Sequence, residues 1–243
     1  MLHKTRGIIF KTTNYSESSV VVQIFTEKFG LQSYIINGVK KPRAKISANM
    51  LQPLHLVDMV VYHKHTGGVQ RIAELKNSPI LLSIPYDIIK SSIAIFLNEV
   101  LHKAVKQQSP DEHLFDYIFS SIEWLDHQVN GLANFHLLFL LKLTRYLGFY
   151  PDRIQAKDAP YFDMKNGVFS LFKPDSPLIL SPPHTQNFYR LLQFNFNEPD
   201  EIVLPNDERR YLLNKLLDYY ALHIEGFGNI RSHEVLEEVL NPR

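Results

Sequence analysis

Residues 19–37 read SVVVQIFTEKFGLQSYIIN, and this stretch decides the fold of the first part of the chain. Its first half is rich in β-branched residues, which favour a strand. Phe29 and Gly30 close a turn, and the second half alternates so that Tyr34 and Ile36 lie on the face opposite Ile35. The pattern predicts a β-hairpin of two short strands.

Strand-like segments lie on both sides of this hairpin. Residues 8–10 begin one before it, and residues 50–62 form a longer candidate that Pro53 interrupts early. Gly67 and Gly68 supply the positive φ angles of a tight turn into a strand at 69–76. Five strands within about seventy residues, with one polar insertion before the fourth, predict a five-stranded OB-type β-barrel at residues 1–78.

From residue 79 onward the apolar spacing changes to that of helices. Apolar residues recur at three- and four-residue intervals after Pro85, after a capping segment at 109–112, and from about 133 to 147. The last of these helices is apolar on most faces and ends at Gly148, as expected for a central helix with a glycine after its C-cap.

The rest of the chain mixes an irregular insert with more helices. Residues 151–183 are rich in proline and aspartate, with a small hairpin around Asn166 and Gly167, and further helices begin near residues 181, 206 and 232. The fold class is therefore α+β: an N-terminal barrel followed by an α-helical domain at 79–243, with a small insert at about 151–183.

The net charge of +1 hides an uneven distribution along the chain. Residues 1–76 contain eleven Lys and Arg but four Asp and Glu, a net charge of +7, so the remaining residues carry −6. A basic segment joined to a mildly acidic one indicates a polyanionic partner, either nucleic acid or an anionic membrane surface.

The sharpest local feature is the basic loop at residues 38–45, which carries Lys40, Lys41, Arg43 and Lys45. Flexible cationic side chains in such a loop neutralise phosphates and bind nucleic acid without sequence preference. A solvated loop that only aids solubility is the alternative. The predicted nucleic-acid contacts are these four residues, four further cations and one ring for base stacking: Lys11, Lys28, Arg71, Lys76 and Tyr34.

Stacking is the weaker part of this prediction. OB modules stack bases on aromatic rings, and Tyr15, Tyr34 and Tyr62 are the rings available in the strands and turns. Tyrosines at alternate strand positions also pack inside barrels, so this alternative stays open at the level of sequence.

A second candidate site lies on the apolar helix. Lys142 and Arg145 interrupt a surface that includes Leu138 and Phe139. A cation beside an apolar groove would hold the carboxylate of an acidic-hydrophobic peptide. The alternative is that the two cations extend to water from a buried helix.

Several function classes find no support in the sequence. There are no cysteines, which excludes disulfides, thiolate catalysis and cysteine-based metal sites. Phosphate-loop, dinucleotide, nucleophile-elbow and zinc-protease motifs are missing, and His63 and His65 lack further ligands. We expect no catalytic residues, no metal and no cofactor. No signal peptide or membrane-spanning run is found, so we expect a cytoplasmic protein without a membrane partner.

A series of short motifs runs along nearly the whole chain. In the barrel these are GIIFK at 7–11, YSES at 15–18, FTEKFG at 25–30, GVKKPR at 38–43 and LQP at 51–53. In the helical part they are NEVL at 98–101, LFDY at 114–117, LGF at 147–149 with Pro151 and Asp152, and IRSHE at 230–234. Together and in this order, the motifs resemble those of the RecO family of recombinational repair proteins.

The resemblance implies a non-catalytic repair mediator with an OB domain and a helical domain. Such proteins bind single- and double-stranded DNA, anneal complementary strands, and act with RecR. They also bind the acidic C-terminal tail of single-stranded DNA-binding protein and help RecA displace it, which implies a nucleoid-associated protein. The basic loop then becomes a DNA contact, and the groove near Lys142 and Arg145 a candidate tail site.

One departure from the family concerns a zinc module. Many relatives carry four cysteines after the Leu-Gly-Phe segment, whereas residues 156–180 contain none here, so hydrophobic packing must hold the insert. The alternative function is that of an OB-containing adaptor that binds protein or structured RNA.

Overall fold

The computed structural model describes residues 1–64, 67–154, 157–194 and 202–240. The chain forms two compact units, residues 1–127 and 128–243. The change from strands to helices after residue 78 therefore falls inside the first unit, which contains the barrel and two helices. In sequence this unit holds fourteen Lys and Arg and eleven Asp and Glu, a net charge of +3.

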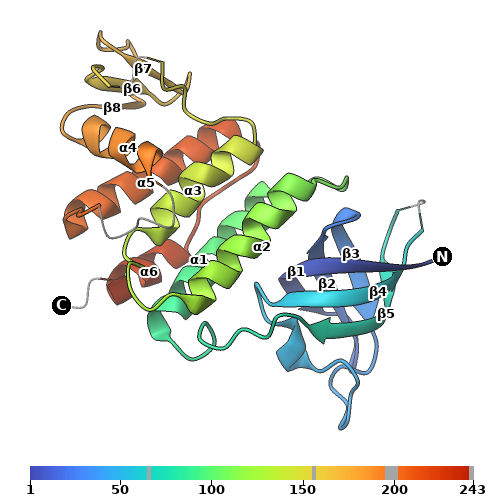
Figure 1. The fold of residues 1–243 in the computed structure, drawn as a ribbon. Helices are drawn as coiled ribbons and strands as arrows, with labels where there is room; N and C mark the ends of the chain where they lie inside the picture. The colour runs from blue at the N-terminus through green and yellow to red at the C-terminus, as the bar shows by residue number, and fades with distance from the viewer. Residues whose placement is uncertain (65–66, 155–156, 195–201, 241–243) are drawn as a thin grey trace. The chain divides into compact units, whose positions relative to one another are not determined.

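The first unit begins with a closed five-stranded barrel, as predicted (Figure 1). Its strands pair in the order β1-β2-β3-β5-β4, and all pairs are antiparallel except β3 with β5. The strands are β1 (Leu2–Asn14), β2 (Val20–Thr26), β3 (Gly30–Ile36), β4 (Leu56–Tyr62) and β5 (Gln70–Asn77). This is the OB-type architecture that the turn spacing predicts.

The fourth strand is shorter than predicted. Residues Ala48–Leu51 form the short 3-10 helix η1, and β4 starts only at Leu56, beyond Pro53. The proline lacks a backbone N–H and cannot continue a paired strand at this point. The hydroxyl of Thr12 donates to the carbonyl of Leu51 at 2.9 Å and so holds η1 against the barrel. His65 and Thr66 lie outside the described residues.

Two helices complete the first unit, α1 (Ile88–Ala104) and α2 (Glu112–His127). Asp87 caps α1 by accepting hydrogen bonds from the backbone N–H groups of Ile89 and Lys90. The capping segment at 109–112 opens α2, but the capping side chain is that of Asp111 rather than Ser109, since Asp111 accepts from the N–H of Leu114 at 2.9 Å.

A buried polar network fixes the segment that leads from β5 to α1. The carboxylate of Asp126, at the end of α2, accepts backbone hydrogen bonds from Leu82, Ser83 and Ile84 at 2.8–2.9 Å. The ammonium of Lys90 donates to the hydroxyl of Ser83 and to the carbonyl of Asp126. Burial raises the pKa of Asp126, but the backbone donors outweigh it and the pKa lies below its ordinary value. This network accounts structurally for both buried charges.

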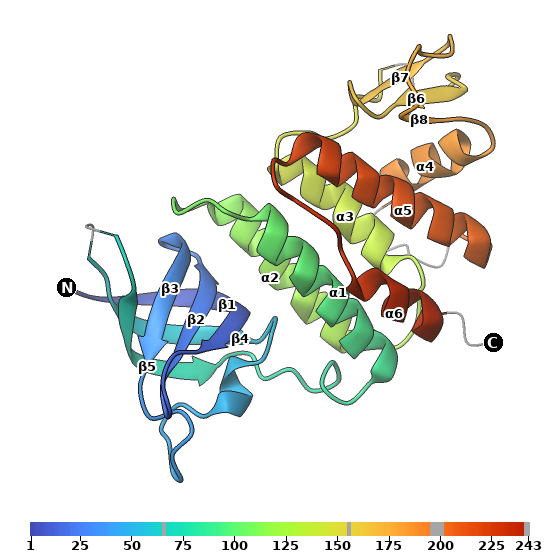
Figure 2. The same ribbon diagram turned by 180° about the vertical axis from the view of Figure 1, so that it is seen from behind.

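The second unit is built around α3 (Phe135–Tyr146), which is buried on most faces, as its composition predicts. Gly148 follows with φ +86°, a left-handed conformation that favours glycine after a helix. The other helices are α4 (His184–Gln193), α5 (Asn206–His223) and α6 (Ser232–Leu240). Helices α4 and α5 both pack on α3 (Figures 1 and 2).

The insert forms a small sheet in the order β7-β6-β8, from β6 (Tyr161–Asp163), β7 (Val168–Ser170) and β8 (Ile179–Leu180). Strands β6 and β7 form the hairpin predicted around Gly167. Phe162 is fully buried, with its ring centroid 4.8 Å from those of Phe169 and Phe188 and 5.7 Å from that of Tyr219. Aromatic packing therefore joins the sheet to α4 and α5.

The described part of the chain has neither a metal-binding cluster nor a helix that could span a membrane. Within it, no group of three or more His, Asp or Glu side chains is arranged to hold a metal ion. Its helices are also too short or too polar to cross a bilayer.

Candidate nucleic-acid interface

The basic loop at residues 38–45 joins β3 to η1 and projects beyond the ends of the strands (Figure 1). Two successive turns shape it: the N–H of Lys41 donates to the carbonyl of Gly38, and that of Ala44 to the carbonyl of Lys41, both at 3.1 Å. Val39 is buried in the barrel core, and Ile46 packs against the same core. The loop is therefore attached to the barrel at both ends by apolar side chains.

All four cations of this loop are exposed to solvent. Among the residues that the structure describes, none of the four forms an ion pair with a carboxylate. Arg43 adopts a left-handed backbone conformation, with φ +63°, that costs a non-glycine residue on the order of 1 kcal/mol. A concentrated positive charge without acidic partners suits a polyanion. The cations that form it are Lys40, Lys41, Arg43 and Lys45.

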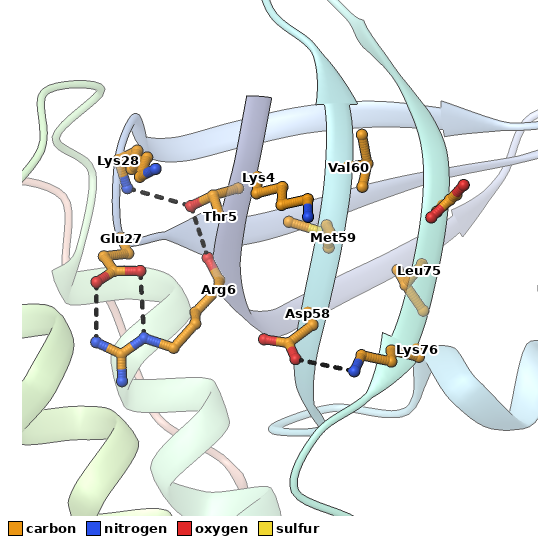
Figure 3. A pocket seen from close by; sticks show the side chains of 11 residues that line it. Lys4, Thr5, Arg6, Glu27, Lys28, Asp58, Met59, Val60, Leu75 and Lys76 are labelled. Atoms are coloured by element: carbon orange, nitrogen blue, oxygen red, sulfur yellow. Dashed lines mark hydrogen bonds and ion pairs between the residues drawn. The ribbon is translucent and has the colours of Figure 1, made fainter. Parts of the chain in front are cut away.

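Two other predicted contacts, Lys28 and Lys76, line a separate hollow on the outer face of β1, β4 and β5 (Figure 3). The hollow has a volume of about 820 Å³ and also contains Lys4, a cation that the sequence prediction missed. Three carboxylates share it: Glu27, Asp58 and Glu74. Asp58 lies 3.4 Å from the ammonium of Lys76, so the hollow has mixed charge, unlike the basic loop.

Arg6 lines the hollow but is held in two ion pairs. Its guanidinium donates to both carboxylate oxygens of Glu27, at 3.2 and 2.9 Å, and to Asp116 of α2 at 2.7 Å. It also lies over the rings of Phe115 and Phe119, at 4.9–5.1 Å from their centroids. The hydrogen bonds from Arg6 lower the pKa of Glu27 although partial burial opposes the shift. Arg6 therefore joins the barrel to α2, and its charge is already balanced by two carboxylates.

The last two predicted cations lie elsewhere on the barrel. Lys11 follows a bulge in β1 and pairs with Gln23 of β2, whose side chain is hydrogen-bonded to His102 of α1 at 2.8 Å. Burial, together with the charges of Lys11 and Lys103, lowers the pKa of His102. Arg71 is exposed at the start of β5, opposite Ile35 and Tyr62. The predicted cations thus form more than one group.

The prediction that Tyr34 stacks on a base is wrong. Its ring is fully buried in the barrel core and burial raises its pKa strongly, so it cannot stack on a base. The sequence places Tyr34 and Ile36 on one face, and that face points inward. The exposed tyrosines of the barrel are Tyr15 and Tyr62, at 68% and 48% exposure.

The predicted peptide groove on α3 also needs correction. Leu138 and Phe139 are fully buried, so they pack in the core of the second unit and offer no apolar surface to a peptide. Lys142 is partly buried and Arg145 is exposed. Only the two cations of the predicted site remain accessible.

These two cations belong to a cluster whose other members the sequence prediction missed. The guanidinium groups of Arg145 and Arg153 lie 4.9 and 5.8 Å from the ring centroid of Tyr150. Burial, with the nearby charges of Arg145 and Arg153, lowers the pKa of Lys142. Arg153 follows Pro151 in an irregular segment without periodicity. No pattern in the sequence therefore predicts that it lies near the cations of α3.

Comparison with known proteins agrees with this architecture. Residues 1–78 match the family model described as "Recombination protein O N terminal", and residues 85–232 match "Recombination protein O C terminal". The DNA repair protein RecO of Flavobacterium psychrophilum is 37% identical over 241 residues, covering 98% of this chain and 99% of that protein.

Other relatives extend the same match. The DNA repair protein RecO of Azobacteroides pseudotrichonymphae is 36% identical over 99% of this chain and 100% of its own length. That of Porphyromonas gingivalis is 29% identical, with the same coverage. Both family models and these full-length similarities lead to one conclusion: the chain belongs to the RecO family of DNA repair proteins.

Proposed function

We propose that this protein is a non-catalytic mediator of recombinational DNA repair that binds single- and double-stranded DNA and promotes strand annealing. The observation that carries the proposal is the basic loop: four exposed cations, anchored by Val39 and Ile46, without a carboxylate partner in the described parts of the chain. Residues 1–78 would hold DNA, and residues 79–243 would hold protein partners.

Charge neutralisation is the proposed mechanism of annealing. Two complementary strands repel each other through their phosphates, and cations that bind the backbone release condensed counterions and lower this repulsion. Contacts to phosphates carry no sequence information, so they allow the bases to pair freely. The left-handed backbone of Arg43 supports the proposal, since glycine would adopt this conformation without strain but would lack the guanidinium.

Protein partners form the second part of the proposal. As a cytoplasmic, nucleoid-associated mediator, the protein would act with RecR and, indirectly, RecA on strands coated by single-stranded DNA-binding protein. The acidic C-terminal tail of that protein would contact Lys142 and Arg145, and Arg153 and Tyr150 extend the site. With Leu138 and Phe139 buried, charge rather than an apolar groove would bind the tail.

The test removes the charges of the basic loop. A variant with Lys40, Lys41, Arg43 and Lys45 all changed to Ala should fold normally but bind and anneal DNA poorly. On single strands the slope of log affinity against log salt concentration should fall by about 3, because each phosphate that the protein neutralises contributes about 0.7. Fluorescence anisotropy over a salt series and a strand-annealing assay measure the two effects, with and without the DNA-coating protein.

A matched variant controls for loss of net charge. Four exposed cations of the second unit serve this purpose: Lys157, Lys165, Lys173 and Arg190. Their change to Ala should leave annealing close to wild type. Equal annealing by the loop variant and wild type would remove the loop from the site. Preference for structured RNA over DNA in competition binding would favour an adaptor instead.

A further inference from the structure

A row of side chains crosses the outer face of the barrel at the end away from α1. In the strand register Leu2 of β1 lies opposite Tyr62 of β4, and Tyr62 lies opposite Arg71 of β5. Arg71 in turn pairs with Ile35 of β3. Inward neighbours such as Val61 and Gln70 are buried, so the members of this row point outward.

The row offers an exposed aromatic ring between an aliphatic side chain and a cation. Tyr62 is 48% exposed and Leu2 53% exposed. Arg71 is exposed and has no ion-pair partner within the described ranges of the chain. Because all three residues are held on paired strands, the surface is preorganised and its use by a ligand costs little ordering of the backbone.

Positive charge lies close to one end of the row, at the basic loop. The basic loop begins three residues after Ile35, just beyond the end of β3 at Ile36. On the neighbouring row of the same face, Lys4 lies opposite Val60, which in turn lies opposite Glu74, so the charge on that side is mixed (Figure 3). A strand of nucleic acid whose backbone follows the basic loop would therefore bring the next bases toward Tyr62.

We propose that Tyr62, with Leu2 and Arg71, is a stacking platform for an unpaired base of single-stranded nucleic acid. The ring would stack on the face of the base, and the guanidinium of Arg71 would bind an adjacent phosphate. Bases within a duplex are covered by their neighbours, so the platform selects single strands. This inference rests on the proposed function and assigns part of the barrel to bases rather than phosphates.

The test compares Tyr62→Ala with wild type on three ligands of equal length: an oligothymidine, an abasic oligonucleotide and a duplex. Fluorescence anisotropy should show about tenfold weaker binding of oligothymidine by the variant, with unchanged binding of the abasic strand and the duplex. The salt slope should also stay unchanged, because the variant keeps every cation that binds a phosphate. Tyr62→Trp should keep the affinity of wild type, and Tyr62→Leu should behave like Tyr62→Ala.

Controls separate this platform from general DNA binding. Tyr86, 88% exposed before α1, provides a matched tyrosine, and Tyr86→Ala should bind all three ligands like wild type. Equal loss on the abasic strand and oligothymidine, or no loss on either, would overturn the platform. If the wild-type protein bound no DNA, or bound it with an affinity that did not depend on salt, the proposed function would be wrong instead.

Discussion

The basic loop and the hollow on β1, β4 and β5 contain similar cations in opposite settings. The four cations of the loop face solvent. Among the described residues, no carboxylate forms an ion pair with any of them. In the hollow, Lys76 is paired with Asp58, and Arg6 is held by Glu27 and Asp116. The number of lysines and arginines is therefore a poor guide to where a polyanion binds, since acidic neighbours decide which cations remain available.

The largest expected effect concerns Arg6, the engaged cation of the hollow. Arg6→Ala should lower the free energy of unfolding by roughly 2 kcal/mol, because Glu27 and Asp116 lose a common partner and two phenylalanine rings lose a cation. The figure is modest because the side chain is 36% exposed. Urea unfolding followed by circular dichroism measures it.

Lys76→Ala is the matched control for Arg6. Its ion pair with Asp58 is 3.4 Å long and well exposed, so its loss should change stability by less than about 0.5 kcal/mol. Equal effects of the two variants would show that Arg6 is only another surface cation. DNA affinity should differ little from wild type in both, in contrast to the loop variant.

Low pH should remove the contribution of the Arg6–Glu27 ion pair to the stability of the protein. The pKa of Glu27 lies below its ordinary value because of the hydrogen bonds from Arg6. The pair therefore stabilises the protein fully above the unfolded-state pKa of about 4.3, and this contribution disappears as pH falls through the lower folded-state pKa. The stability gap between wild type and Arg6→Ala should be constant from pH 7 to 5 and narrow below pH 4. A gap that stayed constant to pH 3 would contradict this assignment.

The smallest effect is a gain of DNA affinity. If carboxylates prevent the hollow from binding DNA, a double Asp58→Asn and Glu74→Gln variant should bind single strands roughly threefold more tightly at low salt. Anisotropy at low and moderate salt measures the gain, which should disappear as salt screens it. The reciprocal Lys28→Ala and Lys76→Ala variant should lose less than about twofold. A large loss in that variant would make the hollow a main DNA contact.

The sequence predicts the strands of the barrel well because turns and β-branched residues are local signals. Gly30, for example, closes the β2–β3 hairpin with φ +64°, and the Pro53 interruption marks the delayed start of β4. Local signals do not settle which face is inside, since Ile35 and Ile36 are equally apolar. For this reason the sequence leaves two interpretations of Tyr34 open, and only the closed barrel shows that it is buried.

The candidate site is less predictable because it depends on distant pairs. Arg6 and Asp116 are 110 residues apart in sequence, and their contact removes a cation from the available charge. Most faces of α3 are apolar, so the pattern does not show that Leu138 and Phe139 point into the core. The basic loop is evident from the sequence because its four cations lie within six consecutive positions.

The aromatic packing around Phe162 has a consequence for the conditions under which the insert stays folded. A sheet joined to α4 and α5 by phenylalanine rings, in a chain without cysteine, does not depend on thiol chemistry. Chelators and mild oxidants should therefore leave it intact. Because apolar burial weakens on cooling, low temperature rather than a change of thiol redox state should destabilise the packing of the insert.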